Sequence, residues 1–301
     1  MCDRTRWSSL MSDVSSNIHA ARPWSSSIRG LHIEGLAWGN PQAHPVLALH
    51  GWQDNAASFI PLMSHVMRWT EDLYVVAPDL LGHGRSAWRP HQSAYHFVDW
   101  LRDIHDLLQK LSWPQYSMIG HSMGAGIASL WAGLYPKRCV DLVLIEGLGP
   151  LSTPAHEVPE QLAKALQTSI LPFRERSSLD ELVRQRCKLT PMKPENAHCL
   201  MTRSTQVSKE GKVQLLQDPM LRMPSLLRFT EDQVLSFMGR ITCRTLLIKA
   251  SDGWPFDPSL MQQRLECLAL VHLEEIEGQH HVHMDDPAQV ARLCYEFWNR
   301  A

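Results

Sequence analysis

Short apolar runs alternate along the chain with longer stretches in which apolar residues recur at helical spacing. Such runs are typical of strands covered on both faces, and they occupy 46–49, 73–77, 116–119, 140–145 and 245–248. Looser alternation predicts edge strands within 28–38, and 271–276 predicts a last strand. The helices expected between and after them cover 56–69, 95–111, 125–135, 258–268 and 287–298. This order predicts an α/β fold with a mostly parallel central sheet flanked by helices.

The character of the sequence changes after residue 149. Prolines recur there, and short helices are expected at 156–170, 178–187 and 195–204. Thr230 precedes two acidic residues, which predicts a helix N-terminus with an N-cap. We therefore expect a core made of 28–148 and 240–301, interrupted by a helical insertion at 149–239. The polar, serine-rich residues 1–27 are expected to form a disordered N-terminal tail.

Composition narrows the class of protein. With 301 residues, 44% hydrophobic and 20% charged, the chain suits a globular protein with a sizeable core. A net charge of −2 gives no electrostatic basis for binding nucleic acid or an anionic membrane. No apolar run approaches the roughly 20 residues that span a bilayer, and 1–27 lacks the apolar core of a secretory signal.

The number and spacing of the cysteines indicate the cellular compartment in which the protein is found. The seven cysteines are odd in number, scattered, and form no C-x-x-C pair. Buried thiols in a reducing compartment explain this pattern better than disulfides or a zinc site. We therefore expect a cytoplasmic protein.

The strongest local motif is G-x-S-x-G at 120–124, centred on Ser122. An apolar strand precedes it and an apolar helix follows, which is the setting of a nucleophile elbow. Glycines beside the serine avoid clashes in a sharp turn. The free N–H groups of the new helix point toward the serine, where they can stabilise negative charge.

A serine hydroxyl needs a base, and the base needs a group that holds its orientation. In a parallel sheet, such groups gather beyond the C-terminal ends of the strands. The polar groups found there are His50-Gly51-Trp52, Ser122, Asp252 and the histidine-rich loop at 278–283.

The order serine, acid, histidine matches the α/β-hydrolase arrangement, and further motifs extend the match. His50-Gly51-Trp52 resembles the H-G-x oxyanion loop of that family, residues 79–86 resemble its D-x-x-G-x-G-x-S loop, and 278–287 resemble its terminal histidine loop. The chain thus resembles the capped, epoxide-hydrolase-like serine hydrolase branch of the α/β-hydrolase superfamily over about 28–298. The resemblance implies that 149–239 is a helical cap.

The resemblance also implies roles. Ser122 attacks a carbonyl carbon, a histidine takes its proton, and the backbone N–H groups of Trp52 and Met123 bind the oxyanion. The implied reaction is hydrolysis of a carboxylic ester, a thioester or an amide of a small molecule, without a cofactor. Relatives with aspartate at the elbow open epoxides or dehalogenate, and the serine here argues against both.

Two other functions are compatible with the same residues. One is hydrolysis of a carbon–carbon bond, or lyase chemistry, on the same triad. The other is a ligand-binding member of the fold that has lost catalysis. The sequence leaves the natural substrate and the oligomeric state open.

The identity of the base and the acid is less clear from the sequence. Counting back from Pro287 selects His280 as the base, with His281 as the alternative. Asp252 is the predicted acid, although it stands one position before the usual carboxylate. Glu146, at the end of the preceding strand, is the alternative acid. A third candidate, Asp257, suits the cap of the next helix.

Several other residues are not expected to take part in the reaction itself. Asp79 and Arg85 are expected to fix their own loop. Trp52, Trp88 and Trp254 are expected either to line an apolar pocket beside Ser122 or to belong to the core. A metal cluster of His280, His281 and His283 is disfavoured because no other ligand stands out. Basic residues of the insertion are expected on a solvated helix face; they are Arg174, Arg176, Arg184, Arg186 and Lys188.

Overall fold

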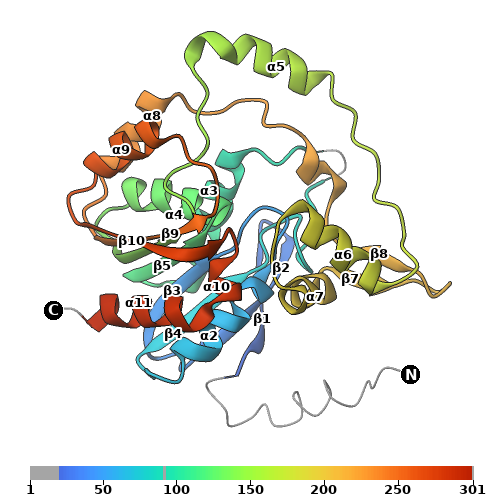
Figure 1. Ribbon diagram of the computed structural model, residues 1–301, viewed down its shortest axis with the longest axis horizontal. Helices are drawn as coiled ribbons and strands as arrows, with labels where there is room; N and C mark the ends of the chain where they lie inside the picture. The colour runs from blue at the N-terminus through green and yellow to red at the C-terminus, as the bar shows by residue number, and fades with distance from the viewer. Residues whose placement is uncertain (1–19, 91–92, 300–301) are drawn as a thin grey trace.

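The computed structural model describes residues 20–90 and 93–299. Within them an eight-stranded sheet has the order β1-β2-β4-β3-β5-β6-β9-β10, and it runs through the middle of the molecule (Figure 1). Its strands are β1 (Arg22–Ile28), β2 (Leu31–Gly39), β3 (His44–Leu49), β4 (Leu73–Pro78), β5 (Tyr116–His121), β6 (Cys139–Ile145), β9 (Arg244–Asp252) and β10 (Val271–Gln279). β2 is antiparallel to both of its neighbours, and the other pairs are parallel.

Helices cover both faces of this sheet (Figure 1). On one face lie α3 (Phe97–Leu111), α4 (Met123–Leu134), α8 (Glu231–Met238) and α9 (Pro258–Glu266). On the other lie the 3-10 turn η1 (Ala56–Phe59), α2 (Ile60–Val66), α10 (Val282–Asp285) and α11 (Pro287–Asn299). Each layer buries its own apolar cluster against the sheet, so the core has two halves. The predicted α/β architecture is confirmed.

The strand register brings the C-terminal ends of the central strands to one edge. In β5 and β6, His121 pairs with Ile145, and in β6 and β9, Ile145 pairs with Ile248. Since parallel strands in register end together, the residues that follow them meet. Ser122 and Glu146 are the first residues beyond β5 and β6, and His280 is the first beyond β10.

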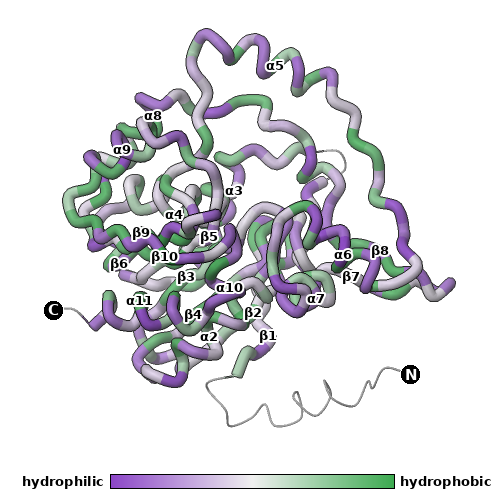
Figure 2. Tube along the Cα trace, in the orientation of Figure 1, coloured by the Kyte–Doolittle hydropathy of each residue, from purple (hydrophilic) through white to green (hydrophobic). Residues whose placement is uncertain are grey.

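The segment between β6 and β9 adds no strand to the main sheet. It contains η2 (Ala155–Glu157), α5 (Val158–Leu166), α6 (Leu179–Leu189), α7 (Pro194–Arg203), the hairpin β7 (Thr205–Val207) and β8 (Val213–Leu215), η3 (Pro219–Arg222) and α8. We call residues 149–239 the inserted segment. α5 stands apart at the top of Figure 1, and its tube alternates between hydrophilic and hydrophobic colours in Figure 2. α6 and α7 lie beside the sheet at the right of the same view.

Two elements depart from the sequence-based expectations. Residues 22–27, which we assigned to the tail, belong to β1, while 1–19 lie outside the described residues. The Ser-rich strand was missed because it buries only Ile28 fully, so no apolar run marks it. The β7–β8 hairpin was missed because each strand has three residues, too few for a period to be visible. None of the described helices has the length and apolarity needed to cross a bilayer.

Candidate active site

Ser122 sits on a tight turn between β5 and α4. Its backbone has φ 52°, a left-handed value that is rare for a residue with a side chain. The turn is possible because of its glycines: a Cβ on Gly120 would lie 2.5 Å from Ala125 Cα, and one on Gly124 would overlap the carbonyl of Leu49. The predicted strand, turn and helix around the serine are therefore present, and the Ser122 side chain remains partly accessible.

His280 contacts the serine directly. Its Nε2 lies 2.9 Å from Ser122 Oγ, and its Nδ1 lies 3.0 Å from Oε2 of Glu146. An ionised carboxylate can only accept, so Nδ1 carries the proton and donates to Glu146. Nε2 is then free of a proton and can accept the hydroxyl proton of Ser122.

Glu146 is held firmly in this position. Its Oε1 accepts from the backbone N–H of Ala250, and its Oε2 accepts from that of Trp254, both at 2.6 Å. The side chain is fully buried. Burial alone would raise the pKa of Glu146, but the hydrogen bonds from His280 and from the two N–H groups lower it below its ordinary value. The carboxylate is thus charged and oriented at neutral pH.

The position predicted for the acid requires a correction. Asp252 ends β9 and is exposed, and among the described residues it forms no hydrogen bond with His280. The contact belongs to Glu146, whose side chain fills the space beside Gly253. The third candidate, Asp257, caps α9 by accepting from the N–H groups of Ser259 and Leu260, as expected.

Burial lowers the pKa of His280 below its ordinary value, although Glu146 acts in the opposite direction. The imidazole is therefore neutral at pH 7 and able to act as a base. His281, the alternative base, is 2% exposed and points to Asp54 instead of Ser122. Burial lowers the pKa of His281 to about 4.

The predicted oxyanion donors are the backbone N–H groups of Met123, which follows Ser122 in the chain, and of Trp52, which lies beyond the neighbouring strand. Met123 is the first residue of α4, so its N–H has no acceptor within the helix. Trp52 follows β3, which pairs directly with β5. Its indole Nε1 donates to the carbonyl of Leu221 in the inserted segment. Their role in binding an oxyanion stays a prediction.

The three tryptophans are not core residues. Trp52, Trp88 and Trp254 are each about half exposed, at 48%, 47% and 47%. The Trp254 ring centroid lies 5.7 Å from that of His280, and Trp88 donates to the carbonyl of Leu216 in the inserted segment. Of the two alternatives, the core assignment is wrong.

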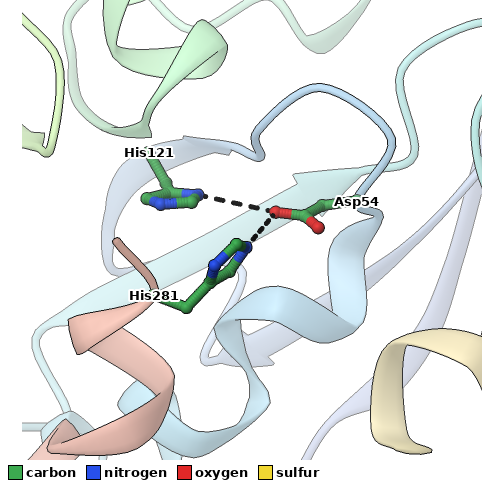
Figure 3. Close-up of side chains that lie close together, drawn as sticks. All are labelled: Asp54, His121 and His281. Atoms are coloured by element: carbon green, nitrogen blue, oxygen red, sulfur yellow. Dashed lines mark hydrogen bonds and ion pairs between the residues drawn. The ribbon is translucent and has the colours of Figure 1, made fainter. Parts of the chain in front are cut away.

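A second buried polar group includes the chain neighbours of Ser122 and His280, and Figure 3 shows its residues Asp54, His121 and His281. Asp54 Oδ2 is 3.1 Å from His281 Nε2 and 3.6 Å from His121 Nδ1. These ligand atoms lie within 4.8 Å of one another, and two imidazoles with a carboxylate can bind Zn²⁺. The guanidinium of Arg186, however, is 2.6 Å from Asp54 Oδ1 and 3.3 Å from His281 Nε2. Because Arg186 already supplies the balancing positive charge, we interpret the group as an ionic cluster, the Asp54 cluster.

The cluster differs from the trio that the sequence suggested for a metal. His280 is engaged with Ser122, and His283 Nε2 lies 2.7 Å from Ser58 Oγ. Sequence reasoning also placed Arg186 on a solvated face, which is wrong: its side chain is 11% exposed. The missed signal is its helical spacing from Leu182 and Val183, which puts all three on the buried face of α6.

The expectation for Asp79 and Arg85 is confirmed. Asp79 Oδ1 accepts from the N–H of Ala56 and Oδ2 accepts from that of Arg85, each at 2.8 Å. Arg203 of α7 also donates to both oxygens of Asp79 through Nε. The loop is therefore fixed from within and tied to the inserted segment.

Comparisons with known proteins agree with this geometry. The family model described as alpha/beta hydrolase fold matches residues 44–175. A serine hydrolase-like protein of Danio rerio is 27% identical over 91% of this chain and 86% of its own length. The crystal structure of a hypothetical protein from Pseudomonas aeruginosa PAO1 is 31% identical, with a TM-score of 0.83 over 92% of this chain and 99% of that one. A thioesterase domain from the curacin biosynthetic pathway is 25% identical, with a TM-score of 0.81 over 92% and 99% of the two chains.

The sheet, the elbow and these matches define the class: the chain is an α/β hydrolase. Over most of its length it is similar to proteins named serine hydrolase-like, which supports a hydrolase.

Proposed function

We propose that the protein is a serine hydrolase that cleaves a carboxylic ester through an acyl-enzyme, with Ser122, His280 and Glu146 as its triad. The observation that carries the proposal is the unbroken path from Ser122 Oγ to His280 at 2.9 Å and from His280 to Glu146 at 3.0 Å. These distances lie within hydrogen-bond range, so proton transfer along the first link requires no rearrangement.

The proposed reaction has two halves. Ser122 Oγ attacks the carbonyl carbon while His280 Nε2 accepts its proton, and the imidazolium is stabilised by Glu146. The N–H groups of Met123 and Trp52 bind the oxyanion, and each such donor is typically worth about 3 kcal/mol of barrier. His280 then protonates the leaving alkoxide, and water repeats the sequence to release the acid.

The surroundings favour a small substrate with an apolar part. We propose that the inserted segment is a cap, because Trp52 and Trp88 each donate to one of its carbonyls. The half-exposed Trp254 beside His280 offers an apolar surface at the reacting centre. Thioesters and amides react by the same mechanism and are included in the proposal. We also propose that the protein acts in the cytoplasm.

The two alternatives have weaker support. A carbon–carbon bond hydrolase or lyase would use the same triad, and no feature of the site favours that chemistry. The hypothesis of an inactive, ligand-binding protein rested on the absence of a carboxylate at the usual position. Glu146 in contact with His280 removes the reason for it.

Labelling with a fluorophosphonate probe, combined with hydrolysis of p-nitrophenyl esters, tests the proposal. We expect the probe to label the wild type at Ser122, and Ser122→Ala to lose both labelling and turnover. The paired variants Glu146→Gln and Asp252→Asn test the acid, since each removes one negative charge. Glu146→Gln is expected to lower kcat by about 10³- to 10⁴-fold, and Asp252→Asn to leave it unchanged.

Turnover that persists in a folded Ser122→Ala protein would refute the mechanism. A large loss of kcat in Asp252→Asn, with a normal kcat in Glu146→Gln, would refute the assignment of the acid. It would not affect the assignment of Ser122 as the nucleophile. Binding of an ester without labelling or product release would favour the ligand-binding alternative.

A further inference from the structure

The proposed reaction uses none of the Asp54 cluster, yet the cluster touches the backbone of the proposed base. His121, the residue before Ser122, donates from Nε2 to the main-chain carbonyl of His280 at 2.9 Å. A carbonyl can only accept, so Nε2 of His121 carries a proton. Nδ1 of the same ring faces Asp54 Oδ2, 3.6 Å away, and the two groups form an ion pair when Nδ1 is protonated as well.

The approach of these two side chains requires Gly51 between them. A Cβ at that position would lie 3.0 Å from both Asp54 Oδ2 and His121 Nδ1. Asp54 and His121 are each fully buried, and within the described residues His121 Nδ1 has no hydrogen-bond partner. Its electrostatic environment is therefore set by buried protein groups, Asp54 among them, rather than by solvent.

The other end of the cluster belongs to the inserted segment. Arg186 of α6 lies 2.6 Å from Asp54 Oδ1 and 3.3 Å from Nε2 of His281, the residue after His280. Met284 packs in the same apolar cluster as Leu182 and Val183 of α6. α6 thus contacts the loop that carries His280 through Arg186 and His281 and through apolar packing, and its ion pair is with Asp54.

Burial makes these contacts strongly interdependent. Asp54 is 1% exposed at its side chain and Arg186 11%. Removing one partner of a buried pair leaves the other charge uncompensated, which is strongly unfavourable. The position of α6 and the position of His280 are consequently coupled through Asp54.

We propose that Arg186, Asp54 and His121 form a buried bridge that holds His280 in its reactive position, so that docking of α6 on the core sets the rate of the chemical step. This inference rests on the proposed function. The three side chains act as positioning residues, because none contacts the reacting atoms.

Kinetics of three variants and two controls test the bridge. Asp54→Asn and Arg186→Met should each lower kcat about 10- to 100-fold with little change in KM, because the base is misplaced. Arg186→Lys, which keeps the charge, should recover part of the loss. Arg184→Met, an exposed arginine of the same helix, should behave as wild type. Arg203→Met removes a different buried ion pair to the inserted segment and should raise KM or lower the Tm without lowering kcat.

Two readouts do not depend on catalysis. Hydrogen–deuterium exchange of residues 280–285 should be faster in Asp54→Asn and Arg186→Met than in the controls. The titratable groups around His280 are Glu146, Asp54 and three histidines, His121, His281 and His283. Because the negative charge of Asp54 raises the pKa of His280, Asp54→Asn should lower that pKa in NMR titration, with the signal assigned through His280→Gln.

Unchanged exchange and unchanged kcat in Asp54→Asn would overturn the bridge, as would an equal loss of kcat in Arg203→Met. If Arg186→Met does not fold, the isosteric Asp54→Asn decides. Loss of activity on chelation, restored by Zn²⁺ alone, would overturn it in favour of a metal site. Failure of the probe to label wild-type Ser122 would refute the proposed function, while the exchange data would still judge the bridge.

Discussion

Gly253 decides which residue can supply the carboxylate to His280. A Cβ at this position would lie 2.5 Å from Oε1 of Glu146 and would overlap its Cδ and Oε2. We therefore predict that Gly253→Ala displaces Glu146 from His280 and from the N–H groups of Ala250 and Trp254. Each lost hydrogen bond to a charged group costs about 1.5–3 kcal/mol. If only the bond to His280 is lost from the transition state, kcat/KM falls by roughly 10- to 150-fold.

The same geometry predicts a rescue. An aspartate at 253 carries its carboxyl carbon about 1.5 Å beyond Cβ, which brings it close to the place of the Glu146 carboxylate. Gly253→Asp alone should be inactive because two carboxylates would compete for one buried space. Combined with Glu146→Ala, it should recover at least about tenfold in kcat/KM over either single variant, a non-additivity expected of contacting residues.

The assay is hydrolysis of a p-nitrophenyl ester, with circular dichroism and Tm recorded for every variant. Gly239→Ala is the matched control, because its nearest contact would be an ordinary 3.5 Å from the Leu235 carbonyl. A folded Gly253→Ala protein with wild-type kcat/KM would refute the reasoning, since it would show that turnover does not need the Glu146 carboxylate where the structure has it.

Two further predictions concern pH. Since burial lowers the pKa of His280 and only the deprotonated ring accepts a proton, kcat/KM should rise with pH through an inflection below 6.5, and Glu146→Gln should move this inflection lower. An inflection above 6.5 would contradict this. Burial also lowers the pKa values of His50, His83 and His281 to about 4, 3 and 4, so the unfolded chain binds more protons than the folded one below pH 6.5. The free energy of unfolding should then fall by about 2 kcal/mol per histidine between pH 7 and pH 5. Urea unfolding measures this, and a flat profile would count against it.

The nucleophile could be predicted from the sequence because every determinant of the elbow is local. The strand, the two glycines and the following helix lie within twenty residues of Ser122. The acid could not be predicted in the same way. Glu146 and Gly253 are far apart in the chain, and the space that Gly253 leaves is visible only once β6 and β9 are paired. Local pattern therefore yielded three candidate carboxylates and favoured Asp252, which does not contact His280.

Arg186 was placed wrongly from the sequence for a different reason. Five basic residues in the insertion suggested a solvated surface, and composition outweighed spacing in that interpretation. Its helical spacing from Leu182 and Val183 predicts a buried position, but a buried arginine is credible only with a known partner. That partner, Asp54, lies 132 residues earlier in the chain.

The loop that carries His280 needs anchoring beyond its own strand. The β9–β10 register shifts between Ile276 and Gln279, so the ladder does not hold the last residues of β10 continuously. Gly278 has φ 148°, a conformation that favours glycine and leaves the chain free to turn there. Besides Ser122, two side chains restrain His280 beyond this turn: Glu146 holds the imidazole, and His121 holds the main-chain carbonyl. Because the imidazole is displaced whenever its backbone moves, the contact with Glu146 fixes the ring only if the contact with His121 fixes the loop.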